Sequence, residues 1–284
     1  MASLKDLRRR IRATTSMQQI FKAMEMVSAA KLRRAQARAL AAAPYSRKIG
    51  EVLANLAGAA AELEHPLFKV REAKTTALVV VTADRGFAGA YNTNVMRVVE
   101  PRLREAPGAF RVVVLGRKGR DYLRRRGYPV LAAHTELPGE ASLDFARTLT
   151  DELIGRFTSG EVDRVELVYS HFVNALTRRI QTEVFLPVGG ATGGAPARDR
   201  GAIFEPDAEA IFAELLPRYT TAKLYAAMAD ALASEHSARM VAMGSARKNA
   251  GELVDALTLT RNRLRQAAIT KEIAELVGGA EALR

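Results

Sequence analysis

Cysteine is absent from this chain of 284 residues. Its absence excludes disulfides, cysteine-ligated zinc and a thiol nucleophile. Histidine occurs four times, at His65, His134, His171 and His236, but without the spacing of metal ligands. Long apolar runs are also lacking, because a run such as TTALVVVTA is far shorter than the roughly 20 residues that cross a bilayer. We therefore expect no metal site, and contact with a membrane only through a partner.

Proline is scarce at the N-terminal end. Pro44 is the single proline between residues 3 and 60, where alanine, leucine, methionine, arginine, lysine and glutamine dominate. These residue types lose little side-chain freedom in a helix. Apolar residues such as Ile20, Met24 and Val27 recur at the spacing of one helix face, and such a stripe must be buried against something. The segment predicts one long helix, or two helices joined near Pro44.

The segment from residue 207 to residue 277 has the same character. Pro217 is expected to bend its helix, and Gly278 and Gly279 are placed to end it. Two long helices at opposite ends of one chain, each with a narrow apolar stripe, predict an antiparallel coiled coil.

The middle of the chain changes to the patterns of an α/β domain. Short β-branched runs predict buried parallel strands, and a last strand follows that could lie at the sheet edge. The strand runs occupy residues 75–83, 110–116, 128–134, 164–172 and 178–188, and helical patterns between them cover 90–105, where Pro101 interrupts, 117–127 and 141–157. This alternation predicts a central, Rossmann-like parallel α/β domain.

The whole chain is thus expected to be an α/β protein with three segments. These are an N-terminal coiled-coil helix at 1–60, the central domain at 75–190 and a C-terminal coiled-coil helix at 207–284. A glycine-rich stretch at 189–201 predicts an exposed loop before the last helix.

One strand-to-helix junction, VVVTADRGFAGAYNTN at residues 79–94, has the order of elements that often binds phosphate. Its glycines, Gly86 and Gly89, match neither G-x-G-x-x-G nor G-x-x-x-x-G-K-[ST], and no lysine follows to reach a phosphate. Asp84 and Arg85 have no second carboxylate or histidine nearby in sequence, which favours a local ion pair or helix cap over catalysis. A tight turn that needs glycine is favoured, and a nucleotide site stays open as the alternative.

The net charge of +12 is concentrated at one end. Residues 1–50 hold twelve basic and two acidic residues. A solvated helix face, nucleic acid or an acidic protein partner would each account for this segment, and charge alone does not rank the last two. The helix has no aromatic residues interleaved with its charges, which disfavours binding to single strands.

Three stretches together carry a specific resemblance. They are LRRRIRATTSMQQIFKAMEMVSAAKLRRAQ near the start, DRGFAGAYNTNV in the middle and SEHSARMVAMGSARKNAGELVDALTLTRNRLRQAAITKEIAELVGGAEAL at the end. In this order, and over the entire chain, they resemble the gamma subunit of the bacterial F-type ATP synthase. The chain departs from that family in reading GFAGA where GLCGG is common, which removes a thiol and a glycine from the turn. Because the chain has no cysteine at all, a thiol switch of the chloroplast kind is excluded.

The resemblance implies a non-catalytic rotary central stalk. The two terminal helices would form a coiled coil inside the ring of alternating alpha and beta subunits, and the α/β domain would lie near the epsilon subunit and the proteolipid c-ring. Proton flow would turn the ring and the stalk, and the stalk would drive the catalytic beta subunits through their conformations. The chain itself would bind no cofactor and no nucleic acid, with ATP, ADP and Mg in the partner subunits. It would be peripheral, on the cytoplasmic side of the cell inner membrane or plasma membrane.

The same resemblance carries roles to five positions. Arg265 and Gln266 would reach acidic and hydroxyl groups on a beta-subunit loop, and Met24 would face beta where coupling is sensitive to added charge. Phe204 and Glu205, in IFEPD, would lie near epsilon and the proteolipid ring. A nucleotide-dependent enzyme using residues 79–94 and a nucleic-acid-binding protein using the basic first helix remain the alternatives.

Overall fold

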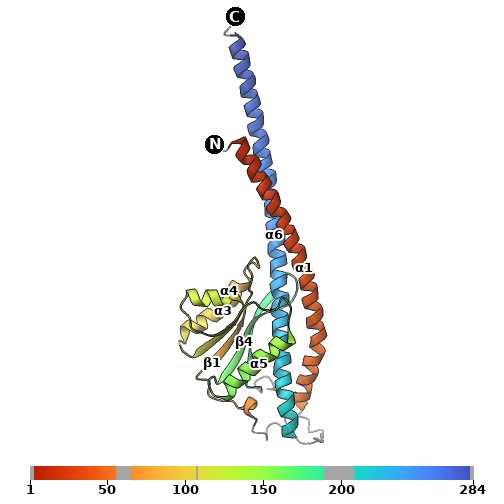
Figure 1. Cartoon of the computed structure of the whole chain (residues 1–284), viewed down its shortest axis with the longest axis vertical. Coiled ribbons are helices and arrows are strands. Elements are labelled where there is room, and N and C mark those ends of the chain that lie inside the picture. Colours follow the sequence, from red (N-terminus) through yellow and green to blue (C-terminus); the bar gives the residue numbers. More distant parts are fainter. Residues whose placement is uncertain (1–2, 56–64, 107, 189–207, 282–284) are drawn as a thin grey trace. The chain divides into compact units, whose positions relative to one another are not determined.

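The computed structural model describes residues 3–55, 65–106, 108–188 and 208–281. The chain divides into two compact units, Met1–Ser28 with Met240–Arg284, and Ala29–Arg239. Two long helices, α1 (Leu4–Asn55) and α6 (Ala208–Glu281), each contribute residues to both units (Figure 1). The expected loop at 189–201 lies outside the described residues.

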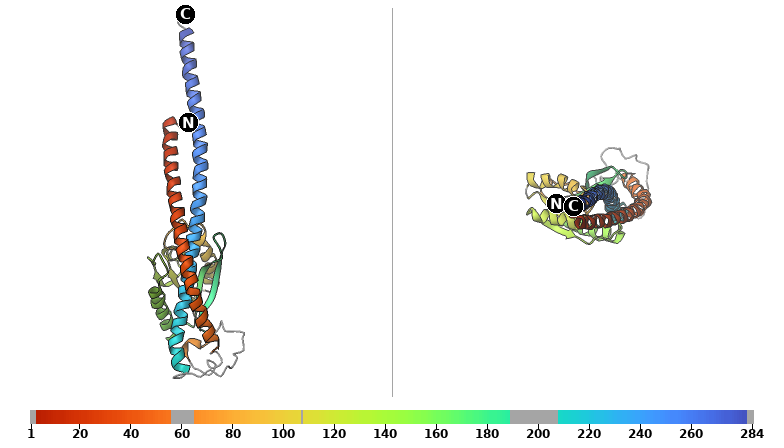
Figure 2. Two further views of the ribbon diagram at one scale, coloured as in Figure 1. Left: turned by 90° about the vertical axis from the view of Figure 1, so that its right-hand side faces the viewer. Right: turned by 90° about the horizontal axis from the view of Figure 1, so that it is seen from above.

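The helix pair of the first unit is antiparallel, with α1 and α6 side by side in both side views (Figures 1 and 2). Its seam buries small or polar residues beside a few apolar ones, including Leu7, Thr14, Met243 and Ala250. A seam of this kind allows close approach of the two helices but removes little apolar surface from water.

The second unit contains a five-stranded sheet with the order β3-β2-β1-β4-β5. Its strands are parallel except for the antiparallel edge strand β5. The elements are β1 (Thr76–Val81), β2 (Phe110–Leu115), β3 (Val130–His134), β4 (Arg164–Phe172) and β5 (Arg178–Leu186), with α3 (Tyr91–Glu105), α4 (Arg117–Arg125), α5 (Leu143–Thr158) and a short 3-10 helix, η1 (Pro66–Phe68). The mixed α/β fold and its strand and helix segments therefore confirm the predictions.

Helices cover both faces of this sheet, as expected for a parallel sheet. Side chains alternate along β1, so Leu78 and Val80 pack with α3 and α4, whereas Val79 and Val81 pack with α5 and α6. The second face also receives Ile49 from α1. The segment of α6 that crosses the sheet is thus part of the core of the second unit.

Three prolines lie inside continuous helices, so the interruption expected at Pro101 is wrong, and of the two alternatives at Pro44 the structure has the single helix. Pro44 is within α1, Pro101 within α3 and Pro217 within α6. A proline removes one helical hydrogen bond, but packing on both sides of it can hold the helix together. Leu216 and Leu224, for example, are fully buried around Pro217.

The expected end of the last helix is also wrong. Gly278 and Gly279 lie within α6, which continues to Glu281. Glycine costs about 1 kcal/mol relative to alanine in a helix, and a long cooperative helix can absorb that cost near its end.

Candidate functional site: the turn after β1 and the helix pair

The turn after β1 needs only one of its two glycines. Gly89 has a φ of 54°, in the left-handed region that favours glycine, and Phe87 takes a similar φ of 62°. Gly86 is not required by space, because an added Cβ would meet its first neighbour, the Lys118 side chain, at 3.8 Å. The predicted glycine turn is confirmed at Gly89 and wrong at Gly86.

The same turn caps the N-terminus of the neighbouring helix α4. The first three N–H groups of α4 donate to the Asp84 carboxylate at 2.8 Å, the Ala83 carbonyl at 3.0 Å and the Thr82 hydroxyl at 3.0 Å. The second oxygen of Asp84 accepts the Leu137 N–H at 2.7 Å. The cap expected of Asp84 is therefore confirmed, and the donors that a phosphate would use at α4 are already bonded to protein groups.

Contact between the turn and α4 is too close for an intervening ligand. A Cβ added to Gly116, whose φ is 96°, would lie 2.2 Å from the Thr82 carbonyl oxygen. A Cβ added to Gly119 would lie 2.6 Å from the Thr82 hydroxyl oxygen. These two glycines, which the sequence reasoning did not connect with the turn, allow β1 and β2 to pass into their helices side by side.

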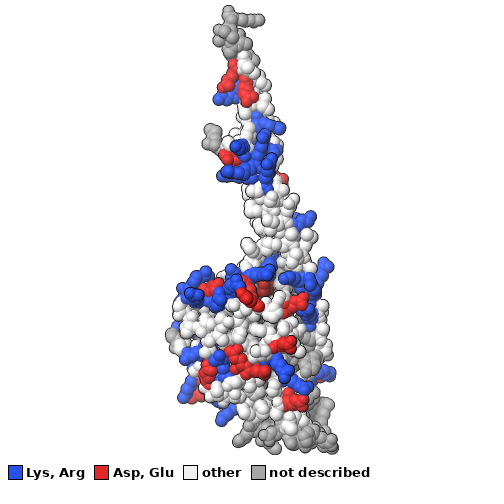
Figure 3. Space-filling model, viewed as in Figure 1, with Lys and Arg blue, Asp and Glu red and all other residues white. Residues whose placement is uncertain are grey.

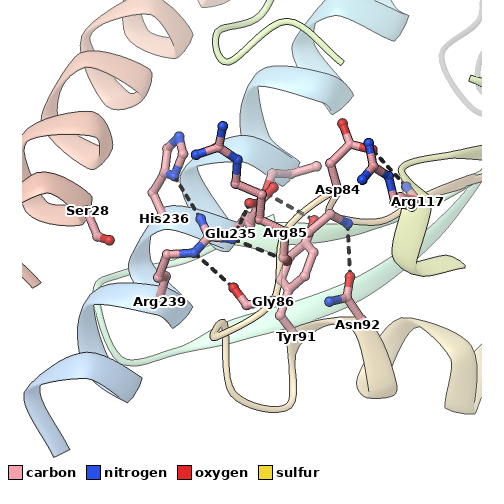
Figure 4. A network of polar contacts seen from close by, with 12 residues as sticks. Ser28, Asp84, Arg85, Gly86, Tyr91, Asn92, Arg117, Glu235, His236 and Arg239 are labelled. Carbon is pink, nitrogen blue, oxygen red and sulfur yellow. Dashed lines mark hydrogen bonds and ion pairs between the residues drawn. The ribbon is translucent and has the colours of Figure 1, made fainter. Parts of the chain in front are cut away.

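On its other side the turn is held by α6. Arg239 donates to the carbonyls of Gly86 at 3.2 Å and Arg85 at 3.4 Å, and it forms an ion pair with Glu235 at 2.6 Å (Figure 4). The Tyr91 hydroxyl donates to the Ala231 carbonyl at 3.2 Å. Burial raises the pKa of the Glu235 carboxyl, and Arg239 opposes that rise. The turn thus anchors the sheet to the helix.

More polar contacts join α6 to the sheet along the same stretch. They are formed by side chains of α6 with backbone groups of β4, β5 and the hairpin between these strands. The contacts are Lys223 to the Val184 carbonyl at 2.6 Å, Asp230 to the Phe172 N–H at 3.1 Å, Ser234 to the Ser170 carbonyl at 2.8 Å and Ser237 to the Ala175 carbonyl at 2.6 Å. We call this row of contacts, from Lys223 to Arg239, the α6 clasp.

In the first unit, polar side chains fix the register of the helix pair. Arg247 donates to the Glu25 carboxylate at 2.8 Å. The Glu25 carboxylate also lies over Gly244, and the Gln18 amide lies over Gly251, one heptad away on each helix. The two glycines leave room for polar side chains in the seam.

The positions assigned to a beta-subunit contact do not form one cluster. Met24 is half-buried on α1, whereas Arg265 and Gln266 are exposed on α6. Because Glu25 lies over Gly244, Met24 is level with about residue 245 of α6, which is about 20 residues before Arg265. At 1.5 Å per residue the separation is roughly 30 Å. These residues would therefore touch different parts of a surrounding partner.

Exposed apolar residues form stripes on this helix pair. On α1, Ile20 and Val27 are each 55% exposed, so the stripe predicted there does not face α6. Near the end of α6, Ile269, Ile273 and Leu276 are 47%, 56% and 73% exposed at spacings of four and three. Apolar stripes on both helices are thus left uncovered by the chain itself.

Basic side chains gather where α1 begins, as the cluster of blue atoms near that end of the unit shows (Figure 3). The register places this part of α1 level with Arg261 to Arg265 of α6. Exposed members of the group, which we call the basic collar, are Lys5, Arg8, Arg9, Arg10, Arg12, Arg263 and Arg265. Asp6 pairs with Arg9 at 3.4 Å. The positive charge of the first segment is therefore exposed to solvent next to the apolar stripe at the end of α6.

Three further expectations concern the c-ring contact, membrane spans and metal sites. Phe204 and Glu205 lie outside the described residues. Among residues 3–55, 65–106, 108–188 and 208–281, no helix has a stretch long and apolar enough to cross a bilayer. Over the same ranges, no three histidine or acidic side chains are grouped in a way that could hold a metal ion.

Comparisons with known proteins extend over the full chain. A family model described as ATP synthase matches residues 3–283. Gamma chains of ATP synthase from Desulforamulus reducens and Moorella thermoacetica are 48% and 45% identical, with all of both chains covered in each case. A chain in the central stalk and c-ring structure of the Tetrahymena thermophila mitochondrial ATP synthase is 25% identical, with a TM-score of 0.64, and the match covers 80% of this chain and 99% of that one. A chain from the Euglena gracilis mitochondrial ATP synthase matches with a TM-score of 0.74 at 20% identity, over 99% of this chain and 94% of that one.

Proposed function

The chain belongs to the ATP synthase gamma chain family, and from this premise we propose how it works as the rotary central stalk. It is a non-catalytic subunit, and the catalytic sites lie in the beta subunits. Rotation of a proteolipid ring would turn this chain inside a ring of alpha and beta subunits. Its orientation-dependent contacts would bias each beta subunit among conformations of different nucleotide affinity, with ATP, ADP and Mg bound by the partners.

The observation that carries this proposal is the uncovered apolar stripe at the end of α6. In the seam register, Leu4 lies level with Arg265, so the turns beyond it have no partner from α1 among the described residues. Ile269, Ile273 and Leu276 are exposed there. An isolated helix of this length is marginal in water, and burial of the stripe in a surrounding sleeve would stabilise it.

Charged contacts would complement that apolar contact. Arg265 is exposed at the edge of the stripe, and its guanidinium can bind a carboxylate through two parallel hydrogen bonds. We assign Arg265 and Gln266 to one contact with beta and Met24 to a second contact farther down the helix pair. Phe204 and Glu205 are proposed to meet epsilon and the c-ring.

The α6 clasp would make the α/β domain turn together with the shaft. Its contacts run from Lys223 to Arg239, so a sideways load on the domain is shared among several hydrogen bonds and a buried core. We propose that segments 1–60 and 207–284 are the two helices of the shaft and that segment 75–190 is the domain attached to them. The complex would hold this chain peripherally, on the cytoplasmic face of the membrane.

Reconstitution tests the function directly. The full chain by itself is expected to hydrolyse no ATP, and to restore ATPase activity and rotation when it is mixed with alpha and beta subunits. Arg265→Ala should weaken torque transmission, whereas Arg263→Ala, an exposed arginine on the same turn of helix, serves as the matched control. A mixture that stays inactive with the intact chain would refute the proposed role, and equal effects of the two variants would refute the assignment of Arg265.

A further inference from the structure

A cavity of about 450 Å³ opens at the carboxyl end of β1 and β2 in the second unit. Thr82 and Leu115, at the strand ends, line its floor, and the loop at residues 136–139 forms one wall. Side chains of α6 and Lys31 of α1 line the remaining wall. The carboxyl ends of parallel strands are where α/β proteins usually bind ligands, and the volume lies in the range of small-molecule sites.

Acidic side chains in the cavity wall already have partners. The Asp84 carboxylate accepts two backbone N–H groups, at 2.8 and 2.7 Å. Glu235 is paired with Arg239 at 2.6 Å, and Glu136 with Arg117 at 3.3 Å. Arg239 and Arg117 therefore neutralise two of the three carboxylates, and backbone N–H groups stabilise the third, Asp84, so the lining keeps a net charge of +1.

The other two basic residues, Lys31 and Arg85, form no ion pair within the described ranges, although the charge of Lys31 helps to oppose the rise that burial causes in the pKa of the Glu235 carboxyl. Within the described part of the chain, the side chains of Lys31 and Arg85 make no hydrogen bond and no ion pair. Arg85 extends between His236 and Asp84 in the close view (Figure 4). Burial, together with the charges of Arg239 and Lys31, lowers the pKa of the His236 imidazole to about 4. This ring is consequently neutral at pH 7 and can act as a hydrogen-bond donor or acceptor in a positive environment.

We propose that this cavity binds the phosphate group of a small molecule, with Lys31 and Arg85 as the binding cations. A phosphate carries a charge of about −1.5 to −2 at pH 7 and would be attracted by the net positive lining, whose two described cations without an ion pair are Lys31 and Arg85. Arginine would supply a planar pair of donors and lysine a mobile point charge. Recognition would come from side chains, because the first backbone N–H donors of α4 already bond to Asp84, Ala83 and Thr82 of the turn. The proposed rotary function assigns this chain no ligand, so the inference goes beyond it.

Histidine resonances of the full chain provide the test. Chain labelled with carbon-13 at its four histidines is titrated at pH 7 with inorganic phosphate and, in a separate arm, with ADP, while sodium chloride keeps the ionic strength constant. The His236 signal, identified with His236→Gln, should shift and saturate in at least one arm. Tighter binding of phosphate than of ADP identifies the free anion as the ligand, and tighter binding of ADP identifies a nucleotide.

Matched variants locate the site. Lys31→Gln and Arg85→Gln should each weaken the apparent affinity by at least about tenfold, because each removes a charged hydrogen-bond donor to the phosphate. Arg104→Gln, an exposed arginine at the end of α3, should leave the affinity unchanged. Circular dichroism confirms that each variant is folded, and Arg85→Lys, which keeps the charge, should retain part of the binding.

Three results would each overturn the proposal. The first is the absence of a saturable His236 shift in both arms. The second is unchanged affinity in folded Lys31→Gln and Arg85→Gln. The third is a loss of affinity in Arg104→Gln as large as that in Lys31→Gln and Arg85→Gln, which would mean that phosphate binding depends only on the net charge of the chain. All three leave the rotary function untouched, because reconstitution tests that function separately.

Discussion

Replacing Arg239 by methionine would test the anchor between α6 and the turn after β1. The Arg239 side chain is 11% exposed and that of Glu235 is 12% exposed, so the substitution leaves a buried carboxylate without its cation. It also removes the donors to the Gly86 and Arg85 carbonyls. Removing one partner of a buried ion pair typically costs 3–5 kcal/mol, and we expect about 3 kcal/mol because the pair keeps some contact with water.

Hydrogen exchange of the β1 amides measures this cost, because their protection reports opening of the second unit. The double variant Arg239→Met with Glu235→Gln should recover about 1–2 kcal/mol, since no charge is then left buried without a partner. The penalty of Arg239→Met should also shrink at acidic pH. Burial raises the pKa of Glu235, removal of the guanidinium raises it further, and the carboxyl becomes neutral as the pH falls through that value.

Three outcomes would contradict the proposed role of the Arg239–Glu235 pair. A cost below about 1 kcal/mol for Arg239→Met would mean that the contacts of Arg239 add nothing to the core packing of α6. A double variant as unstable as the single one would show that the stranded charge of Glu235 is not the cause of the loss. A penalty that does not depend on pH would contradict the same cause independently.

Three further predictions concern other parts of the molecule. Gly119→Ala should destabilise the second unit by about 1–3 kcal/mol in urea unfolding, because its Cβ would overlap the Thr82 hydroxyl. Gly155→Ala, also inside a helix but with open space around it, should stabilise the unit by about 0.5–1 kcal/mol. A change of the same sign in both variants would contradict the packing argument. The free energy of unfolding should fall by up to about 3 kcal/mol between pH 6.5 and pH 4, since unfolding allows His236, with its pKa lowered to about 4, to take up a proton, and His236→Gln should flatten that slope. In the assembled complex, Met24→Lys should uncouple ATP hydrolysis from proton pumping more than it impairs assembly, because it adds an unmatched charge at an interface. Met24→Leu should keep normal coupling and normal assembly. Equal coupling in the two variants would count against the role of Met24.

Local patterns in the sequence were sufficient to predict the strands and helices of the α/β domain. The β-branched run at Val79–Val81 has the composition of a strand buried on both faces, and Ser142 caps α5 by accepting the Phe145 N–H at 3.3 Å, as its position before the helix suggests. The interruption at Pro101 was predicted wrongly, and the choice between one helix and two at Pro44 stayed open, because the packing that holds a helix together around a proline comes from distant parts of the chain.

The contact of Arg239 with the turn after β1 and the cavity beside it could not be predicted from the sequence, because they depend on contacts between distant segments. Arg239 and Gly86 are separated by 153 positions, and nothing in the pattern of either segment indicates that they meet. Thr82 and Gly119 are likewise brought together only by the pairing of β1 with β2. In the segment 79–94, the strand-to-helix outline could be predicted from the sequence, whereas the bonding of its acceptors to the N–H groups of α4 could not.

The ion pair between Glu25 and Arg247 also determines how far α6 reaches. In the observed register, the part of α6 from Gln266 to Glu281 extends past the first turn of α1, a distance of roughly 24 Å at 1.5 Å per residue. A slip of one heptad would keep small residues facing each other in places but would change that reach by about 10 Å. Glu25 and Arg247 therefore set how much of the α6 end remains uncovered by α1, and with it the length of helix available for the proposed contact with the beta subunits.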